Sequence, residues 1–426
     1  MNVRKYLFTF TFLTSILLLG GCSLLKSEKN NDNIASSLPI TNTNESETRP
    51  SPTSIPTPTS PTSPSPTSEP TPGPTFTPTL TPTTPTPETT NESRAQTILQ
   101  EMTIEEKVGQ LFFVRLRKEQ ALEDIAQYYL GGYILFGDDF KNENKTSIKK
   151  LLASYQSASV IPMLIGVDEE GGTVNRISKY SAFRAVPFYS PIDLYKEGGF
   201  DLIRSDTLEK ANLLLSLGVN VNLAPVCDVS TNPNDFIYSR SFGRNAEDTS
   251  AYVKAVVEVM KQNKLGSTLK HFPGYGNNVD THTGIAIDER EYNTFVTNDF
   301  LPFEAGIKAG ADSILVSHNI ITCLDKDYPA SLSPKIHEIL RNDLDFTGVI
   351  MTDDLSMDAI KDYTGDDEAA VQAILAGNDL LIASNFEQQI PAVLAAINDG
   401  TISESRLDDS VLRVLKWKLA LDIVAK

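Results

Sequence analysis

The hydrophobic pattern of the chain changes at about residue 100. Beyond that point, short apolar runs alternate with longer segments in which apolar residues recur at helical spacing. The short runs predict strands at residues 111–116, 133–136, 162–167, 219–223, 267–269, 313–317, 348–351 and 379–383. The helical segments include residues 147–155, 207–217, 251–261, 334–340 and 368–376. Thr103 and Glu106 have the spacing of a capping box, so we expect ordered structure to begin near Met102.

Strands that alternate with helices predict an α/β fold. Eight such strands indicate a (β/α)8 barrel of the TIM type, in a single domain over residues 94–426. A doubly wound open sheet is the alternative, because alternation alone does not show that the sheet closes. No Gly-x-Gly-x-x-Gly motif follows the first predicted strand, which disfavours a dinucleotide-binding fold.

The start of the chain has the features of a targeting segment. Arg4 and Lys5 precede an apolar run over residues 6–20, which is short for a spanning helix but typical of a signal peptide. The run ends in Leu-Gly-Gly-Cys22, which resembles the bacterial lipoprotein signal. We therefore expect a signal peptide over residues 1–22, lipidation of Cys22, and a chain anchored to the extracytoplasmic face of the cell membrane. Ordinary secretion with cleavage nearby is the alternative.

Residues 23–93 are polar and rich in proline, threonine and serine. More than half of the 25 prolines lie between residues 41 and 90. Such a segment cannot bury enough apolar surface to offset its ordering entropy, so we expect disorder. Repeated Pro-Thr units favour polyproline II, and residues 50–90 could then reach on the order of 100 Å. The segment is interpreted as a spacer, with a binding site for a specific ligand as the alternative.

The formal net charge of −18 and the absence of a basic stripe argue against a nucleic-acid partner. Two of the three cysteines, Cys227 and Cys323, lie beyond the spacer. Two thiols make no disulfide framework, so we expect two buried apolar residues, although a disulfide between them stays open.

Ionisable residues collect at the carboxyl ends of the predicted strands, where barrel enzymes place their chemistry. They are Asp168, Glu169, Glu170 and Arg176, then Asp228, Lys270, His271, His318, Asp353 and Asp354. Their shared position is difficult to explain as solvated surface, so we interpret them as parts of one active site. The loop after the fifth strand also holds Asp280 and His282, where a carboxylate could orient and charge an imidazole. His337 lies in a predicted helix and is expected at the surface.

Five motifs follow one another in order along the chain. They are residues 166–176 (GVDEEGGTVNR), 240–243 (RSFG), 270–274 (KHFPG), 280–282 (DTH) and 352–357 (TDDLSM). Together they resemble glycoside hydrolase family 3, and within it the single-domain β-N-acetylhexosaminidases, from Thr103 to the C-terminus. The family fold is a (β/α)8-type barrel, which agrees with the periodicity.

The resemblance implies a role for each residue of the site. Asp353 is implied as the nucleophile that forms a glycosyl-enzyme intermediate, with Asp354 as its rival. His282, tuned by Asp280, is implied as the general acid/base in place of the usual second carboxylate. The implied sugar-binding subsite comprises Asp168, Arg176, Arg240, Lys270 and His271.

A metal site built from His271, Asp280 and His282 is an alternative for the loop. The long spacing between the histidines, with no third histidine nearby, gives poor metal geometry. We expect no metal, and the sequence indicates no cofactor.

Three residues depart from the family pattern. Tyr275 stands where many relatives have a second histidine, Thr173 where an arginine is common, and Thr281 in place of the usual serine. The first two are expected to border the substrate pocket, so they affect the preferred substrate more than the chemistry.

These observations predict a retaining exo-glycosidase that releases terminal β-linked N-acetylglucosamine from cell-wall-derived glycans, such as muropeptide-like fragments. A β-glucosidase or a phosphorolytic β-glycosidase on the same fold is the alternative, because a neutral imidazole repels phosphate less than a carboxylate does. A non-catalytic sugar-binding lipoprotein would be expected to lack Asp353 or His282, and both are present.

Overall fold

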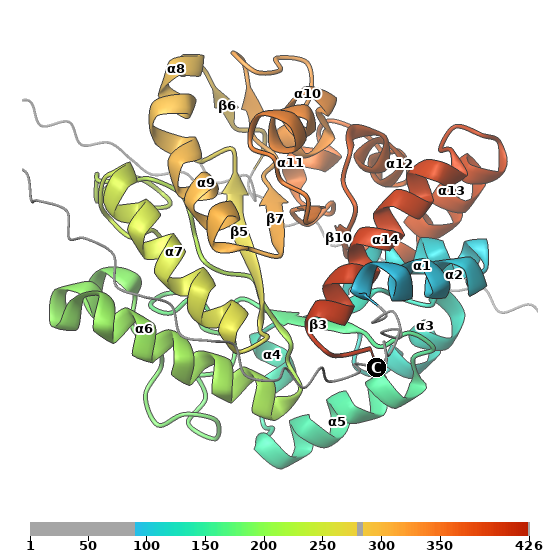
Figure 1. Ribbon diagram of the computed structural model, residues 1–426, viewed down its shortest axis with the longest axis horizontal. Helices are drawn as coiled ribbons and strands as arrows, with labels where there is room; N and C mark the ends of the chain where they lie inside the picture. Colours follow the sequence, from blue (N-terminus) through green and yellow to red (C-terminus); the bar gives the residue numbers. More distant parts are fainter. Residues whose placement is uncertain (1–89, 279–283, 425–426) are drawn as a thin grey trace, which may run out of the picture. The chain divides into compact units, whose positions relative to one another are not determined.

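Eight parallel strands close into a barrel at the centre of the domain (Figure 1). The computed structural model describes residues 90–278 and 284–424. The barrel strands are β1 (Phe112–Arg115), β2 (Gly132–Leu135), β3 (Leu164–Val167), β4 (Val221–Asn222), β5 (Gly266–Phe272), β7 (Ser313–Val316), β9 (Val349–Thr352) and β10 (Leu381–Ala383). They pair in the order β10-β1-β2-β3-β4-β5-β7-β9, and a parallel bridge between Met351 and Leu380 joins the two ends. The predicted (β/α)8 barrel is confirmed, and the open-sheet alternative is wrong.

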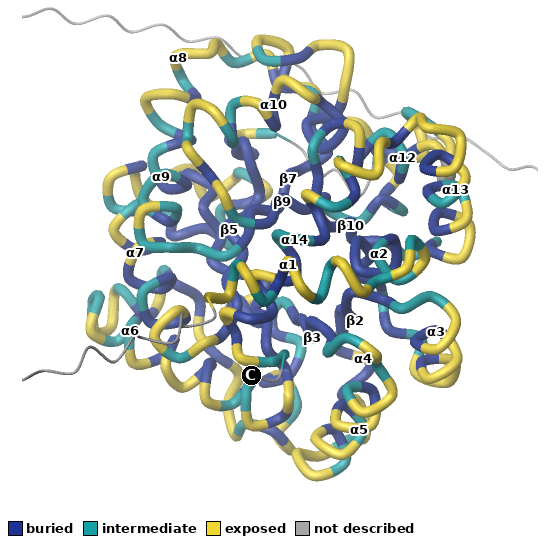
Figure 2. The backbone as a smooth tube through the Cα atoms, turned by 45° about the vertical axis from the view of Figure 1, so that its right-hand side comes forward, coloured by how far each residue is buried: buried dark blue, intermediate teal, exposed yellow. Residues whose placement is uncertain are grey.

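Helices surround the barrel and turn their polar faces outward, so that exposed residues lie on the outer helices and buried residues on the strands (Figure 2). The helices are α1 (Asn91–Glu101), α2 (Ile104–Gln110), α3 (Ala121–Tyr128), α4 (Gly137–Phe140), α5 (Lys145–Ala158), α6 (Pro191–Leu217), α7 (Ala246–Gln262), α8 (Tyr292–Thr294), α9 (Phe300–Ala309), α10 (Pro334–Glu338), α11 (Asp358–Lys361), α12 (Asp366–Ala376), α13 (Phe386–Asn398) and α14 (Glu404–Ala420). Among the helices of the described residues, none combines the length and apolar character needed to cross a membrane.

Helix α1 begins at Asn91, ahead of the expected boundary at residue 94 and of the expected onset of order near Met102. Thr90 caps this helix by accepting the Ser93 N–H at 3.2 Å. Glu92 pairs with Lys416 of α14 at 2.5 Å, and α1 packs against that C-terminal helix (Figure 1). The contact with α14 stabilises a helix whose polar sequence gives little periodic signal. The predicted capping box at the start of α2 is present.

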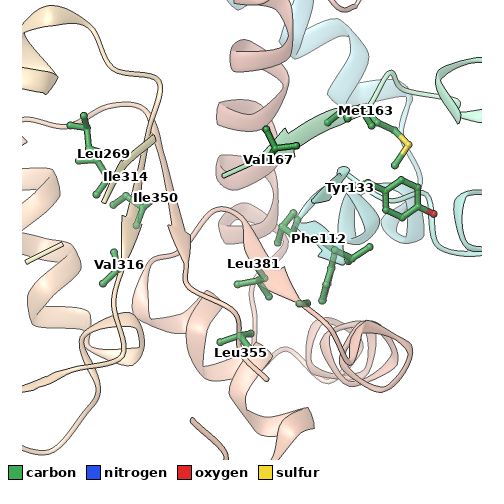
Figure 3. Packing of buried hydrophobic residues seen from close by; sticks show 14 of the residues in the cluster. Phe112, Tyr133, Met163, Val167, Leu269, Ile314, Val316, Ile350, Leu355 and Leu381 are labelled. Atoms are coloured by element: carbon green, nitrogen blue, oxygen red, sulfur yellow. The ribbon is translucent and has the colours of Figure 1, made fainter. Parts of the chain in front are cut away.

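Side chains alternate along each strand between the barrel interior and the surrounding helices. The interior cluster is formed by Phe113, Ile134, Leu164, Val221, Leu223, Leu315, Val349, Met351, Leu380 and Ile382. Strand residues of opposite orientation, such as Phe112, Tyr133 and Ile350, pack outside the barrel (Figure 3). Trp417 of α14 joins the interior cluster, where Gly266 allows its close approach because a Cβ there would lie 3.0 Å from Trp417 Cζ2. Helix α14 therefore closes the barrel at the amino ends of its strands.

Two expectations about burial are wrong. His337 is only 3% exposed, because Gly377 packs closely against its side chain and Nδ1 is bonded to the Ser333 carbonyl oxygen at 2.8 Å. Burial lowers the pKa of His337 and favours the neutral ring. Cys323 is exposed rather than buried, whereas Cys227 is buried as expected, and both are free thiols.

Several boundaries also differ from the predicted ones. Strands β6 (Ile287–Asp288) and β8 (Ile320–Ile321) form a second, two-stranded parallel sheet, and both are too short for a periodic signal. The predicted helix at residues 207–217 is the second part of α6, which is interrupted where Gly198 and Gly199 leave helical geometry. Neither difference changes the order of the barrel strands.

Candidate active site

A cavity of about 410 Å³ opens at the carboxyl ends of the barrel strands. Its apolar lining is the upper part of the barrel interior: Ile134, Leu223, Leu315 and Ile382. Its polar lining includes six residues predicted for the site: Asp168, Arg176, Arg240, Lys270, His271 and Asp353. The structure therefore brings together residues from the ends of three strands, β3, β5 and β9, and from the loops after β3 and β4. The other predicted site residues, Asp280, His282 and Cys22, lie outside the described residues.

Lys270 and His271 both line the cavity, although neighbouring residues of a regular strand point to opposite faces. The ladder between β5 and β7 shifts register between Leu269 and Phe272. Irregularities of this kind re-aim side chains near active sites. The shift explains how two consecutive residues contribute to one wall.

Lys270 lies at the centre of an ion-pair network, with a side chain that is only 2% exposed. Its Nζ donates to Asp168 Oδ1 at 2.7 Å and lies 2.6 Å from Glu170 Oε1. Arg240 donates two bonds to the same Glu170 carboxylate, at 3.0 Å and 2.7 Å. Arg176 Nη2 lies 3.6 Å from Asp168 Oδ2. These two carboxylates and three cations form one charged wall, in which Asp168, Arg176, Lys270 and Arg240 line the cavity and Glu170 supports them from behind. Fixed donors and acceptors of this kind suit sugar hydroxyls.

The charge state of Glu170 follows from these contacts. Burial alone would raise the pKa of Glu170, but the neighbouring Lys270 and Arg240 outweigh it and hold that pKa well below its usual range. Burial would likewise lower the pKa of Arg240, and Glu170 raises it well above its usual range. Both groups are ionised at neutral pH, so the wall keeps its charges without rearrangement.

His271 is held in one tautomer by its two neighbours. Arg240 Nη2 lies 3.2 Å from Nε2, and a guanidinium only donates, so Nε2 accepts. Nδ1 then has the proton and donates it to Asp228 Oδ2 at 2.8 Å. Asp228 also accepts the backbone N–H of His271 and that of Tyr275, at 3.1 Å and 2.8 Å. Asp228 thereby fixes both the ring and the start of the following loop.

Glu169 is fully buried and shapes the loop that brings Arg176 to the cavity. Its carboxylate accepts the backbone N–H groups of Arg176, Ile177 and Ser178 at 2.9, 2.8 and 3.1 Å. Gly171 turns the chain with φ of +101°, and a Cβ there would lie 2.2 Å from a backbone oxygen. The loop therefore depends on a glycine and on a buried carboxylate that does not face the cavity.

The two adjacent carboxylates after β9 have different environments, although both Asp353 and Asp354 line the cavity. The Asp354 carboxylate holds its own turn, because Oδ1 accepts the Ser356 N–H at 2.9 Å and Oδ2 accepts the Ser384 hydroxyl at 2.6 Å. The Asp354 N–H donates to Asp353 Oδ1 at 2.9 Å. This geometry favours Asp353 over Asp354 as the carboxylate that meets a substrate.

The family model described as the glycosyl hydrolase family 3 N terminal domain matches residues 103–417. The chain belongs to glycoside hydrolase family 3. The family predicted from the five motifs is thus confirmed.

Named relatives of this family 3 chain are β-hexosaminidases. It is 31% identical over 327 residues to β-hexosaminidase A of Pseudoalteromonas piscicida, a match that covers 70% of this chain and 55% of that protein. A family 3 β-N-acetylglucosaminidase from Paenibacillus sp. str. FPU-7 superposes with a TM-score of 0.71 at 30% identity, covering 76% of this chain and 63% of that one. The β-N-acetylhexosaminidase of Beutenbergia cavernae superposes with a TM-score of 0.66 at 26% identity, covering 74% of this chain and 98% of that one. The chain is therefore a glycoside hydrolase of family 3 that is similar to these proteins, and it spans about half the length of the first of them.

Arg290 anchors the chain on both sides of residues 279–283 in this family 3 barrel. Its guanidinium donates to Asp288 Oδ2 at 2.7 Å, to Asp299 Oδ1 at 3.0 Å and to the Gly274 carbonyl oxygen at 3.2 Å. Gly274 has φ of +123°, and a Cβ there would lie 2.5 Å from Asp299 Oδ1. The turn therefore requires glycine, and Arg290 ties it to β6.

The two departures expected near the pocket lie in different places. Tyr275 is buried and lines the cavity, with its ring edge-on to His271 at a centroid distance of 5.2 Å. Phe236 contacts the same ring from the exposed side, at 5.8 Å. Thr173 is exposed and adjoins Val174, which lines the cavity. Tyr275 is thus the departure whose side chain lies in the cavity, against His271.

Within the described residues, no group of three or more His, Cys, Asp or Glu side chains is arranged to hold a metal ion. The metal alternative required His271, whose two ring nitrogens face Arg240 and Asp228. A nitrogen lone pair that accepts from a guanidinium is not presented to a metal. The donor set of the wall suits an uncharged polar ligand better than a cation.

Sequence reasoning noted Glu170, Asp228 and His318 at strand ends but assigned them no role. Glu170 holds two cations of the wall, Asp228 orients His271, and His318 bonds to the β9 turn. Their positions were readable from the strand pattern. Their partners were not, because each contact joins different strands of the barrel.

Proposed function

We propose that this chain is a retaining exo-β-N-acetylglucosaminidase. The observation that most supports the proposal is that Asp353 lines the same cavity as His271 and the charged wall around Lys270. A carboxylate nucleophile needs a sugar held against it, and a wall with fixed charges positions hydroxyl and amide groups without reorganisation. The apolar floor closes the cavity on the barrel side, which suits a terminal sugar. The relatives' names favour an N-acetylated sugar.

In the first step, a carboxylate oxygen of Asp353 bonds to the anomeric carbon as the glycosidic C–O bond breaks. Protonated His282, stabilised by Asp280, gives its proton to the leaving oxygen. In the second step, neutral His282 takes a proton from water, and the water oxygen bonds to the anomeric carbon as the ester to Asp353 breaks. Two inversions give net retention. The Asp354 N–H, which donates to Asp353 Oδ1, stabilises the carboxylate as it leaves.

The test compares 4-nitrophenyl N-acetyl-β-glucosaminide with 4-nitrophenyl β-glucoside, and follows the anomer of the released sugar by proton NMR. We expect preference for the N-acetyl sugar, first release of the β-anomer, and loss of kcat on the order of 10⁴-fold in Asp353→Asn. His282→Ala should lose most activity on substrates with poor leaving groups. Glucoside preference, or release of the α-anomer, would refute the proposal.

The same assay in phosphate buffer distinguishes hydrolysis from phosphorolysis. A hydrolase releases free N-acetylglucosamine with or without phosphate. Accumulation of a sugar 1-phosphate would move the assignment to the phosphorolytic alternative on the same fold.

We further propose that the enzyme is a lipoprotein that acts on cell-wall-derived fragments outside the cytoplasm. The support is the apolar run that ends in Cys22 and the proline-rich spacer that follows it. An alkyne-tagged palmitate should label the wild-type chain but not Cys22→Ser, which should leave the membrane fraction. A disaccharide of N-acetylglucosamine and N-acetylmuramic acid, compared with chitobiose, tests the substrate class. Release of N-acetylglucosamine from chitobiose alone would exclude the cell-wall assignment.

A further inference from the structure

His318 lies behind the β9 turn, just past the end of β7, and is 0% exposed. Its Nε2 lies 3.0 Å from the Asp354 carbonyl oxygen, and its Nδ1 lies 2.7 Å from Ser331 Oγ. A carbonyl oxygen only accepts, so Nε2 has a proton, whereas the Ser331 hydroxyl can either donate to Nδ1 or accept from it. The contacts therefore fix a proton on Nε2.

Asp354 is held from three directions. The His318 ring fixes its carbonyl oxygen from β7, and the Ser384 hydroxyl, beyond β10, fixes its carboxylate at 2.6 Å. The Met357 N–H donates to the same carbonyl oxygen at 3.0 Å, which closes the turn. Because the carbonyl oxygen and the side chain of Asp354 are both held, the direction of its backbone N–H is fixed as well. That N–H donates to Asp353 Oδ1 at 2.9 Å.

We propose that His318 is a positioning residue for the Asp353 nucleophile. The inference rests on the proposed function, since it assumes that Asp353 attacks the sugar. The His318 Nε2–H holds the Asp354 backbone so that the Asp354 N–H limits rotation of the Asp353 carboxylate. Attack on an anomeric carbon requires one oxygen aligned with the breaking bond, and misplacement by about 1 Å can cost on the order of 10²-fold in rate.

The experiment compares His318→Met with His318→Gln in the full-length chain, using 4-nitrophenyl N-acetyl-β-glucosaminide. Methionine fills a similar volume without a donor, whereas the glutamine amide can place an N–H near the position of Nε2. We expect His318→Met to lower kcat by on the order of 10- to 100-fold with KM within about twofold, because the substrate wall is unchanged. His318→Gln should recover most of the lost kcat.

His337→Met is the matched control. His337 is also buried and bonded through Nδ1, but its partner is the Ser333 carbonyl oxygen within its own helical turn. We expect this variant to lose thermal stability and to keep its kcat per folded molecule. Equal kcat losses in His318→Met and His337→Met would assign His318 a purely structural role.

A second readout does not depend on turnover. The chain has only 4 histidines, so ¹⁵N-histidine NMR of the wild type, assigned with the His318 variants, reports the tautomer directly. A proton on Nε2 of His318 is expected, and a ring without that proton would overturn the inference. An inactive wild-type chain would refute the proposed function, whereas an active wild type matched by His318→Met would refute only the role of His318.

Discussion

Glu170→Gln tests whether the charged wall of the cavity also stabilises the barrel. The wild-type Glu170 carboxylate accepts two bonds from Arg240 and lies 2.6 Å from Lys270 Nζ. Glutamine keeps the shape but removes the charge, so the buried Lys270 and the partly buried Arg240 lose their common carboxylate. Hydrogen bonds to charged groups contribute about 1.5–3 kcal/mol each, and removing one member of a buried ion pair costs about 3–5 kcal/mol. We expect the free energy of unfolding to fall by about 3–5 kcal/mol.

Urea unfolding of the wild type and of Glu170→Gln at pH 7 measures this difference, and Glu209→Gln provides the control. Glu209 also accepts two bonds from one arginine, Arg184, at 2.8 Å and 3.0 Å. Its side chain is 55% exposed, and an exposed pair contributes about 0–1 kcal/mol. Both substitutions remove one charge and keep the shape of the side chain. The difference between their losses of unfolding free energy therefore measures the effect of burial. A loss below about 1 kcal/mol in Glu170→Gln would refute the reasoning.

The stabilisation that the Glu170 carboxylate provides should also depend on pH in a defined direction. The pKa of Glu170 is held well below its usual range in the folded chain, so the unfolded chain binds the proton first as the pH falls. The stabilisation is then fully present above the unfolded pKa of about 4.3, and it is lost as the pH falls from there toward the folded pKa. We expect a constant difference between wild type and Glu170→Gln from neutral pH down to about 5, and a narrowing difference below about 4.3. A difference that widens on acidification would contradict the proposed charge state.

Three further substitutions give independent checks. Burial lowers the pKa of Lys418 to about 7, so the wild-type free energy of unfolding should rise between pH 7 and 9, and Lys418→Met should flatten that rise in urea titrations. Gly266→Ala would place a methyl group 3.0 Å from Trp417 Cζ2 and should destabilise the barrel by about 1–3 kcal/mol, as followed by thermal unfolding, without loss of activity per folded molecule. Asp228→Asn would turn an amide NH2 toward donors and release the His271 tautomer, which should lower kcat/KM by on the order of 10²-fold in steady-state assays.

The alternation of apolar runs made the barrel predictable, because each strand must be buried on both faces in a closed parallel sheet. The same pattern placed Asp168, Lys270 and Asp353 at strand ends, and the structure brings all three to one cavity. Closure itself depends on the pairing of β10 with the first strand, where Phe112 lies opposite Leu381, and on the bridge from Met351 to Leu380, and neither contact leaves a periodic signal.

The sequence did not show which distant segments contact each other. The sequence assigned His337 to the surface, because a helical pattern does not reveal that Gly377, just after the end of α12, covers it. Helix α1 was missed because its stability comes from α14, at the other end of the chain. In both cases the contact that buries or stabilises the residue joins two segments far apart in the sequence, so the spacing of nearby residues does not reveal it.

The acidic residues at the strand ends differ in what they bind. Asp168, Asp353 and Asp354 line the cavity, and the first two are the first carboxylates of their runs. The carboxylates that follow each of them bind backbone N–H groups or cations of the protein: Glu169 and Glu170 after Asp168, and Asp354 after Asp353. The scaffold carboxylates fix the loops, and the fixed loops give the cavity-facing carboxylates a defined orientation. The acidic residues of such a run are therefore not equivalent candidates for catalysis, because the Asp354 carboxylate holds its own turn and the N–H of that turn orients Asp353.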